Sequence, residues 1–352
     1  MGDYQDPDAN TFRFRAIETP WTKGYPVAIP PFYRMLRRFR GHEYDIVHTH
    51  TPFTIGLVGL RWAESHEVPI VSTYHTLYDR YSHYVPFFPR RYVRFRIAKH
   101  TNDYYNRVQH VITPTEASAR WLRRHSVTTP TSVIPTGIPG GVIYDRAEAR
   151  HQLGVPPEAR LLLYVGRLAR EKNLLTLLRA AALVFEQEPR ARLWLVGDGP
   201  YRAECRQIVR DLGIGDRVRF VGAVPREEVD RFYAAADVFV FASITETQGL
   251  VVQEAMNYGL PAIAALGGGA SSSILDGGNG FAVPADAGSI AERALQVLRD
   301  DELYARLSEG AARTSRLAST GAMAERVLEV YERTIRSTDY TLPELSRPFR
   351  VR

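Results

Sequence analysis

The chain has 352 residues, which is too long for one ordinary domain, so two domains are expected. Its 45% hydrophobic and 24% charged residues are typical of a soluble globular protein. The single cysteine, Cys205, excludes an intrachain disulfide and a cysteine-based zinc site, and it is compatible with a reducing compartment. No apolar run approaches the ~18 residues of a membrane-spanning helix, and the acidic, polar start does not resemble a signal peptide. We therefore expect a cytoplasmic protein.

The positive charge is concentrated in the first part of the chain. Residues 1–142 contain 18 Lys and Arg against 11 Asp and Glu, whereas the remainder is nearly balanced, with 27 against 28. This asymmetry indicates a basic N-terminal half that faces an acidic surface, either lipid or nucleic acid. No nucleic-acid-binding module is recognisable, so we expect an anionic membrane surface as a partner and no nucleic acid.

Strands and helices are expected to alternate through the N-terminal half. The predicted strands are 11–17, 45–50, 69–73 and 108–113, and the predicted helices are 32–39, 55–65 and 116–124. This alternation is typical of a parallel, doubly wound sheet. The Pro- and Gly-rich run 133–141 then marks a domain boundary.

An aromatic and basic segment, residues 78–99, is the most unusual surface candidate. The residues that we single out in it are Tyr81, Phe87, Phe88, Arg90, Arg91, Arg94 and Phe95. Such a segment can bury its rings at the acyl boundary of a bilayer while its arginines bind anionic headgroups. The alternative is a helix whose rings pack on its own sheet and whose arginines are solvated.

The C-terminal half repeats the alternation of strands and helices. The predicted strands are 161–165, 193–196, 218–222 and 238–242, and the predicted helices are one that ends near 189 and those at 201–212, 227–235, 250–258, 289–299, 303–309 and 323–337. Arg167 follows the first of these strands, and Lys172 lies at the start of the next helix. Both side chains can therefore reach one anionic group at the carboxyl edge of the sheet.

The stretch 238–261 organises this half of the chain. Glu246 lies in the loop between its strand and its helix, and Glu254 lies about one turn into the helix, since an α-helix has ~3.6 residues per turn. The first-turn amides between them belong to Gly249, Leu250 and Val251. These amides have no intrahelical partner and can bind a phosphate oxygen, while the glutamates can accept hydrogen bonds from hydroxyls on either side. The pattern describes a nucleotide sugar; the alternative is a chance pair of glutamates on a solvated helix.

Six sequence blocks resemble one known family. They are D-I-V-H-T-H at 45–50, V-S-T-Y-H-T-L-Y-D-R-Y-S-H-Y at 71–84, V-I-P-T-G-I at 133–138, Y-V-G-R-L-A-R-E-K-N at 164–173, L-V-G-D-G-P at 195–200 and F-A-S-I-T-E-T-Q-G-L-V-V-Q-E-A-M at 241–256. Together they resemble the retaining glycosyltransferases of the GT-B fold, family 4, and within them the diacylglycerol glucosyltransferases. The resemblance covers about residues 12–337, and the lipid acceptor is indicated only by residues 74–84.

The resemblance implies an α/β, GT-B fold with two Rossmann-like, doubly wound domains and a cleft between them. Residues 1–141 would form the N-terminal domain on the acceptor and membrane side. Residues 142–322 would form the C-terminal, nucleotide-sugar-binding domain. Residues 323–352 would form a helix and tail that pack back toward the N-terminal domain.

The resemblance also implies roles for individual residues. Arg167 and Lys172 would bind the donor diphosphate and stabilise the leaving group. Glu246 would hold sugar hydroxyls, Glu254 the ribose, and the helix amides the phosphate and sugar. His75 would lie over the donor sugar from the opposite domain, and the alternative is an imidazole satisfied beside a strand end.

The implied reaction is transfer of a hexose, with glucose favoured, from a nucleotide sugar, with UDP favoured. The acceptor would be a lipid such as diacylglycerol at the inner face of the membrane, and front-face attack would retain the anomeric configuration. No Asp-x-Asp follows an apolar strand, so neither a catalytic metal nor another cofactor is expected. A mannosyl- or galactosyltransferase that acts on another lipid or glycan is the alternative, and no oligomeric state is specified.

The chain also departs from the family pattern at its beginning. Family members start with a strand and a Gly-rich loop that approaches the donor phosphates, and neither is recognisable before Thr11. We therefore expect an incomplete N-terminal domain. A catalytically inactive scaffold that binds the nucleotide sugar stays open as the alternative. Two further departures are residues 271–273, all serine where a carboxylate is frequent, and Pro139 where aspartate is usual.

Overall fold

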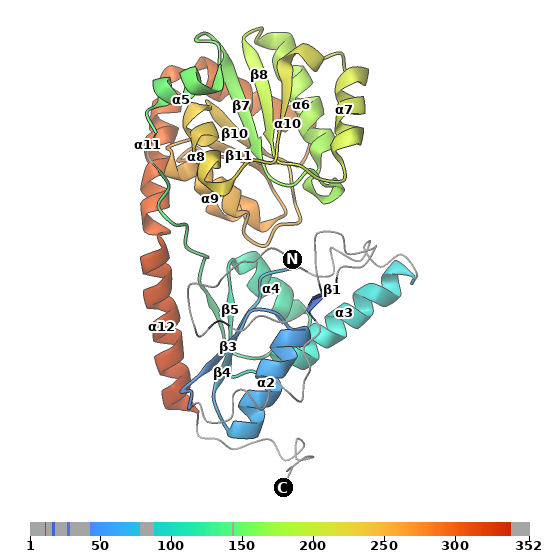
Figure 1. The fold of residues 1–352 in the computed structure, drawn as a ribbon, viewed down its shortest axis with the longest axis vertical. Coiled ribbons are helices and arrows are strands. Elements are labelled where there is room, and N and C mark those ends of the chain that lie inside the picture. Colours follow the sequence, from blue (N-terminus) through green and yellow to red (C-terminus); the bar gives the residue numbers. More distant parts are fainter. Residues whose placement is uncertain are drawn as a thin grey trace. The chain divides into compact units, whose positions relative to one another are not determined.

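The computed structural model describes residue 11 and residues 16–17, 27–28, 43–77, 88–142 and 144–338. The chain divides into two compact units (Figure 1). The N-terminal unit contains residues 1–112, 121–132 and 329–352, and the C-terminal unit contains residues 113–120 and 133–328. Each unit has its own parallel sheet and its own hydrophobic core, which confirms the predicted α/β fold with two Rossmann-like sheets. The exact domain boundaries at 141 and 322 stay a prediction.

The C-terminal unit contains a six-stranded parallel sheet in the order β12-β11-β10-β7-β8-β9. Its strands are β7 (Arg160–Val165), β8 (Ala191–Val196), β9 (Val218–Gly222), β10 (Val238–Phe241), β11 (Ala262–Ala265) and β12 (Gly280–Val283). The first strand, β7, lies beside the fourth, β10, so the direction of winding reverses between them. This reversal is the topological switch point of a Rossmann fold, and ligands bind at the carboxyl ends of the two strands that flank it.

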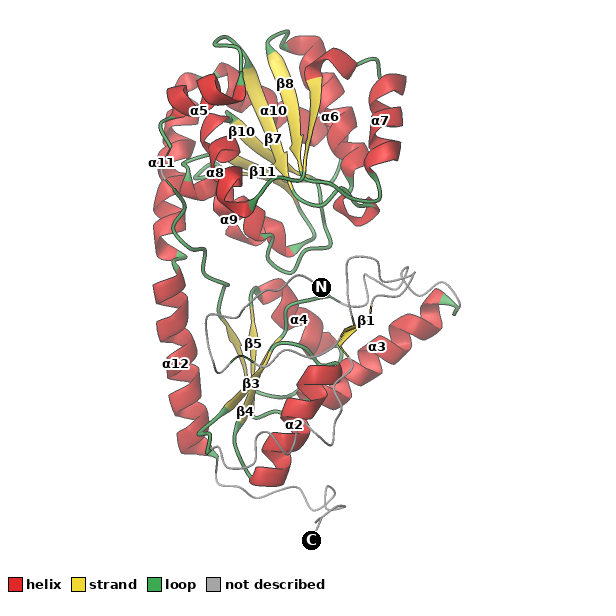
Figure 2. Cartoon of the chain, in the orientation of Figure 1, coloured by secondary structure: helices red, strands yellow, loops and turns green. Residues whose placement is uncertain are grey.

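Helices cover both faces of this sheet (Figure 2). They are α5 (Arg146–Leu153), α6 (Leu174–Gln187), α7 (Arg202–Asp211), α8 (Arg226–Ala235), α9 (Leu250–Asn257), α10 (Ala287–Arg299) and α11 (Asp301–Leu317), with short turns η2 (Arg170–Lys172), η3 (Gly215–Arg217) and η4 (Gly269–Ser273). Val240 lies in an apolar layer with side chains of α6 and α10, whereas its neighbour Phe239 contacts Tyr233 of α8. Successive strand residues point to opposite faces, so α6 and α10 cover one face and α8 covers the other.

The N-terminal unit contains a four-stranded sheet in the order β3-β4-β5-β6. Its strands are β3 (Val47–Thr49), β4 (Ile70–Thr73), β5 (His110–Thr113) and β6 (Thr131–Val133), and the neighbouring helices are α2 (Thr54–His66), α3 (Arg90–Tyr105) and α4 (Glu116–Arg124). The pairs β3–β4 and β4–β5 are parallel. The core packs Leu60 of α2 and Tyr104 of α3 with Ile70 and Val111 of the strands. The last helix, α12 (Thr320–Ser337), belongs to this unit from residue 329 onward.

Several elements differ from the predictions. Ala16–Ile17 (β1) pairs antiparallel with Val27–Ala28 (β2), outside the four-stranded sheet. The predicted helix 303–309 is too short, because α11 continues to Leu317. Strands β6, β11 and β12 and helix α5 were not predicted. The predicted helix 32–39 and nearly all of the predicted extended tail lie outside the described residues. Within the described helices, none combines the length and the apolar content needed to cross a bilayer.

Candidate functional site

The loops after β7 and β10 bring a cation and a carboxylate together at the switch point. Lys172 is the last residue of η2, two residues before α6 begins, and Glu246 lies in the loop between β10 and α9. The Nζ of Lys172 donates a hydrogen bond to Oε1 of Glu246. The two side chains are mostly buried, with 16% and 18% of their surfaces exposed. The pair therefore bridges the two strand ends where ligands bind in this type of sheet.

A second ion pair lies in the loop after β7. Arg167 donates to the carboxylate of Glu171, whose side chain is only 5% exposed. The carbonyl oxygen of Glu171 accepts hydrogen bonds from Ser243 at 3.3 Å and from Thr245 at 3.2 Å, both in the loop after β10. These bonds join the two loops and hold Glu171, the ion-pair partner of Arg167. The sequence prediction named the cation but not Glu171, Ser243 or Thr245, although the spacing of four residues was a signal for the ion pair.

Gly249 begins α9 in a conformation that favours glycine. Its φ is +72°, in the left-handed region. A Cβ at this position would lie 2.5 Å from Cβ of Ala270, in η4. The loop therefore passes close to η4 before the helix starts, and the first-turn amides of residues 249–251 lie ahead of the intrahelical hydrogen bonds. Their predicted role as phosphate ligands stays a prediction.

Glycines also terminate the strands on the other side of the switch point. Gly166 follows β7, Gly197 follows β8, and Gly222 ends β9. A Cβ on Gly197 would lie 2.1 Å from the carbonyl oxygen of Gly166, and its amide donates to the carbonyl of Gly222 at 2.7 Å. Because the three strand ends pack backbone against backbone, they form a part of the carboxyl edge without side chains. The sequence prediction did not identify these three glycines as a group.

Glu254 lies in α9 and is held by α8. Its carboxylate accepts a hydrogen bond from the Tyr233 hydroxyl at 2.9 Å and pairs with Arg226 at 3.4 Å. Arg226 also pairs with Asp230 at 3.1 Å. Burial and the neighbouring Glu254 carboxylate raise the pKa of Tyr233 well above its ordinary value, so this hydroxyl stays protonated and donates. The carboxylate is thus fixed in place, and its contact with a ribose stays a prediction.

The buried side-chain amides of Gln248 and Gln253 hold the start of α9 through hydrogen bonds. The Gln248 amide donates to the carbonyl of Thr136 at 3.0 Å and to Oε1 of Gln253 at 2.7 Å, and it accepts from the Thr136 amide at 2.9 Å. Gln253 donates in turn to Ser273 of η4 at 3.0 Å. Ser273 is one of the three serines at the position where the family often has a carboxylate. Here its hydroxyl completes the support of the loop.

His75, in the N-terminal unit, follows β4 by two residues. Its Nε2 lies 2.8 Å from Nδ1 of His50. Burial, and after it the neighbouring His50, lowers the pKa of His75 to about 4. The imidazole is therefore neutral at physiological pH and can donate and accept hydrogen bonds. Its role at the donor sugar stays a prediction.

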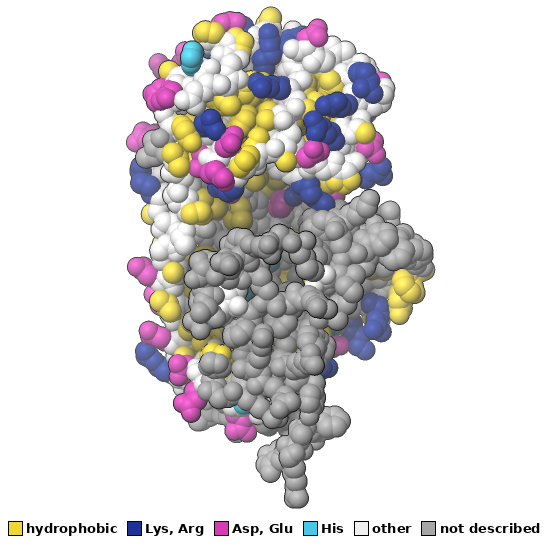
Figure 3. Space-filling view, in the orientation of Figure 1, with side chains coloured by type: hydrophobic (Ala, Val, Ile, Leu, Met, Phe, Trp, Pro, Cys, Tyr) yellow, Lys and Arg dark blue, Asp and Glu magenta, His cyan; other side chains and the backbone are white. Residues whose placement is uncertain are grey.

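Helix α3 carries aromatic and basic side chains on its exposed surface. Phe88 before the helix is 57% exposed, and Tyr92 and Phe95 are 49% and 63% exposed. Arg91 and Arg94 are exposed as well. Figure 3 shows hydrophobic side chains next to basic ones over this helix. Of the singled-out residues, Tyr81, Phe87 and the side chain of Arg90 lie outside the described part of the chain.

Tyr92 and Phe95 lie on one side of α3, and the Phe88 ring lies next to Tyr92. Residues 92 and 95 are three apart in the helix, and the Phe88 ring, before the helix, lies with its centroid 5.9 Å from that of Tyr92, whereas Val93 and Tyr104 are buried. The exposed rings of Phe88, Tyr92 and Phe95 therefore do not pack on the sheet, whereas Tyr104 and Tyr105 at the end of the helix do belong to the core.

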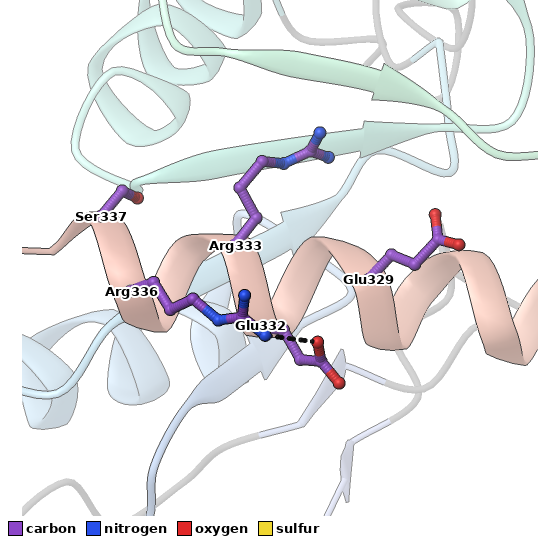
Figure 4. A pocket seen from close by; sticks show the side chains of 5 residues that line it. All are labelled: Glu329, Glu332, Arg333, Arg336 and Ser337. Carbon is purple, nitrogen blue, oxygen red and sulfur yellow. Dashed lines mark hydrogen bonds and ion pairs between the residues drawn. The ribbon is translucent and has the colours of Figure 1, made fainter.

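A surface hollow of about 410 Å³ lies along α12 (Figure 4). Its lining residues are Glu329, Glu332, Arg333, Arg336 and Ser337. Arg336 pairs with Glu332 at 3.0 Å, so the charges of this hollow largely neutralise one another. Among the described residues, no group of three or more His, Cys, Asp or Glu side chains is arranged to hold a metal ion.

Comparisons with known proteins agree with this architecture. Residues 145–314 match the family model of glycosyl transferases group 1, and residues 2–139 match that of glycosyltransferase family 4. The solved structure of sucrose-phosphate synthase from Thermosynechococcus elongatus is similar, with a TM-score of 0.76 and 28% identity, covering 92% of this chain and 83% of that one.

Two similar proteins are known by their activities. The alpha-monoglucosyldiacylglycerol synthase of Streptococcus pneumoniae is 34% identical over 241 residues, which cover 66% of this chain. The match spans only 54% of the length of that relative. The D-inositol 3-phosphate glycosyltransferase of Thermobispora bispora is 31% identical over 323 residues, which cover 86% of this chain and 73% of the relative. The chain belongs to glycosyltransferase family 4, and its two Rossmann-like sheets are those of the GT-B fold.

Proposed function

We propose that this chain is a retaining hexosyltransferase that moves glucose from UDP-glucose to a lipid such as diacylglycerol. The observation that carries the proposal is the Lys172–Glu246 pair across the β7/β10 switch point. A nucleotide sugar needs a cation for its diphosphate and, next to it, an acceptor for its sugar hydroxyls. Lys172 and Glu246 supply these two groups at the place where a Rossmann sheet binds its ligand.

The residues at this edge define the chemistry of the transfer. The bond between the anomeric carbon and the diphosphate oxygen breaks, and a bond from the same face to the acceptor oxygen forms. The acceptor proton moves to an oxygen of the departing diphosphate. Arg167, Lys172 and the first-turn amides of α9 stabilise the charge that builds on the diphosphate, and loss of one such donor costs about 3 kcal/mol in comparable sites. His75 binds the transferred sugar, as the family resemblance implies.

The exposed surface of α3 favours a lipid acceptor over a polar one. The two named relatives act on different acceptors, a diacylglycerol and an inositol phosphate. A soluble inositol phosphate requires no exposed aromatic stripe, whereas an acceptor in a bilayer requires a surface that can lie on it. Phe88, Tyr92 and Phe95, with Arg91 and Arg94 beside them, provide such a surface. We therefore propose peripheral binding at the inner, anionic face of the membrane.

The test is a panel of nucleotide sugars with product mass spectrometry. The acceptors are anionic vesicles that contain diacylglycerol, the same vesicles without it, and free inositol phosphate. We expect glucosyldiacylglycerol from UDP-glucose, lost in Glu246→Ala and retained in the control Glu158→Ala, which removes an exposed carboxylate of the same unit. Glucosylated inositol phosphate would overturn the lipid assignment. Binding of UDP in calorimetry without turnover of any donor would show a nucleotide-binding scaffold instead.

A further inference from the structure

Three histidines gather at the carboxyl edge of the N-terminal sheet. His48 lies in β3, His50 follows this strand directly, and His75 follows the neighbouring strand β4. Because β3 and β4 are parallel, their carboxyl ends lie at the same edge. The proposed reaction uses only His75. The other two imidazoles therefore require an explanation.

His50 and His75 meet edge to edge. Nδ1 of His50 lies 2.8 Å from Nε2 of His75, the ring centroids are 5.1 Å apart, and the ring planes differ by 22°. At this centroid distance, nearly coplanar rings share one hydrogen bond in the plane rather than stack face to face. Only one proton fits between the two nitrogens, so one ring donates and the other accepts. The tautomer of His50 thus determines the tautomer of His75.

His48 lies on the other side of His50 and is itself fixed. The His48 and His50 rings stack with centroids 4.2 Å apart and planes 29° apart. Both nitrogens of His48 have hydroxyl partners: Nδ1 lies 2.5 Å from the Tyr331 hydroxyl of α12, and Nε2 lies 2.7 Å from Oγ1 of Thr73. A ring held at both nitrogens cannot rotate freely. The His48 ring is therefore held in one orientation, and the His50 ring packs against its face.

The cluster is uncharged at physiological pH. The pKa of each of the three histidines is lowered, and burial is the largest cause; with all causes together the pKa is about 3 for His48 and about 4 for His75. Repulsion among the imidazoles adds to this effect for His48 and His75. The fourth titratable group that contacts the cluster in the described chain, Tyr331, has a pKa raised by burial and stays protonated. A neutral cluster allows the donor and acceptor pairing described above.

We propose that His50 is a positioning residue for His75, which it holds in one tautomer and one ring plane. His48, Thr73 and Tyr331 support His50 from behind. The proposal deepens the proposed function and rests on it for its catalytic consequence, because His75 is the residue that binds the transferred sugar there. The positioning itself is a property of the N-terminal unit and is tested without turnover.

The first experiment records the histidine ring nitrogens by NMR over a range of pH. We expect a single neutral tautomer of His75 in the parent protein above about pH 5. In His50→Ala, we expect both tautomers and a pKa of His75 higher by about one unit, since one neighbouring imidazole is lost. His50→Asn places an amide near the position of Nδ1 and should restore one tautomer. The control is His151→Asn, an exposed histidine of the C-terminal unit. An unchanged tautomer and pKa in His50→Ala would overturn the proposal.

The second experiment measures kcat and KM for the donor between pH 4.5 and 8. In metal sites, loss of a residue that orients a ligating histidine lowers metal affinity or activity about tenfold or more. We expect His50→Ala to lower kcat by about this factor with little change in donor KM, and to move the acid limb of the profile to higher pH. Asparagine should recover part of the loss, and Tyr331→Phe should give a smaller change in the same direction.

The two experiments separate the positioning from the proposed function. An equal loss at every pH, with no recovery by asparagine, would show that His50 serves only folding. A parent protein without transfer to any acceptor would contradict the proposed function. In that case, the NMR result alone would still decide whether His50 positions His75.

Discussion

The carboxyl edges of the two sheets are both formed by parallel strands but differ in electrostatics. In the C-terminal unit, the edge at the switch point carries paired charges, such as the Lys172–Glu246 ion pair. In the N-terminal unit, the corresponding edge consists of neutral imidazoles, with His50 and His75 in contact. A cation that already holds a carboxylate can exchange it for a phosphate, whereas a neutral imidazole is suited to a hydroxyl. Parallel strands position both edges, and the residues just after the strands decide which ligand each can bind.

The largest effect is expected where the charged edge loses its cation. Lys172→Ala removes one proposed donor to the diphosphate and leaves the partly buried Glu246 without its charged partner. We expect kcat to fall about 10²- to 10³-fold, because stabilisation of the leaving group is lost. The control, Arg179→Ala, removes an exposed charge from α6 in the same unit and should change kcat less than about twofold. Equal losses in the two variants would mean that net charge, and not the pair, supports the reaction.

The next effect concerns the backbone that carries the charged edge. Gly249→Ala places a Cβ at a φ of +72° and 2.5 Å from Cβ of Ala270. The left-handed conformation alone costs about 1 to 2 kcal/mol, and the overlap adds about 1 to 3 kcal/mol. Gly213→Ala is a matched control, since Gly213 has a φ of +67° with open space around it. Denaturant unfolding should show the larger loss for Gly249→Ala, together with weaker UDP binding in calorimetry.

The region around Gly249 shows which features the sequence could predict and which it could not. The strand, loop and helix around Glu246 were predictable, because a buried apolar run followed by a polar loop and a helical pattern has a local signal. The partners of these residues were not. Glu254 of α9 contacts Tyr233 of α8, which is 21 positions earlier in the sequence, and no local pattern encodes this contact. The same holds for His48 and Tyr331, which are 283 positions apart.

Missed and shortened elements have a similar physical cause. Strand β11, A-I-A-A, has one β-branched residue among alanines, and strand β12, G-F-A-V, has only two strand-favouring residues and begins at a glycine, so both local signals are weak. Helix α11 passes through Gly310, which a sequence-based prediction treats as an end. In the structure, a Cβ at Gly310 would lie 1.8 Å from the carbonyl oxygen of Gly278. The glycine is therefore needed for a close tertiary approach, which overrides its low helix propensity.

The neutral edge should make stability depend on pH. The folded-state pKa values of His48 and His75, about 3 and about 4, lie below the ordinary value of 6.5. As pH falls below 6.5, the unfolded chain binds protons that the folded chain does not, so the free energy of unfolding decreases down to about pH 4. The slope is up to about 1.4 kcal/mol per pH unit for each histidine.

Urea unfolding between pH 7 and pH 5 measures this dependence. His75→Asn should reduce the slope by up to one proton, whereas the exposed control His151→Asn should leave it unchanged. A slope that is the same in the parent protein and in His75→Asn would show that His75 is not held neutral. The carboxyl edge of the N-terminal sheet would then not be a neutral edge, and its proposed difference from the C-terminal edge would be wrong.

The smallest effect is expected for membrane binding by the exposed surface of α3 in the N-terminal unit. Arg91 lies in α3 beside the exposed rings of Tyr92 and Phe95, and a basic residue near an anionic bilayer contributes about 1 kcal/mol. We expect Arg91→Gln to weaken binding to vesicles with anionic lipid about fivefold, measured by co-sedimentation at low salt. Arg313→Gln, on exposed α11 of the C-terminal unit, is the matched control and should bind as the parent protein does. Equal weakening by both variants would assign vesicle binding to net charge, and α3 would then no longer distinguish the N-terminal unit as the side that meets the lipid.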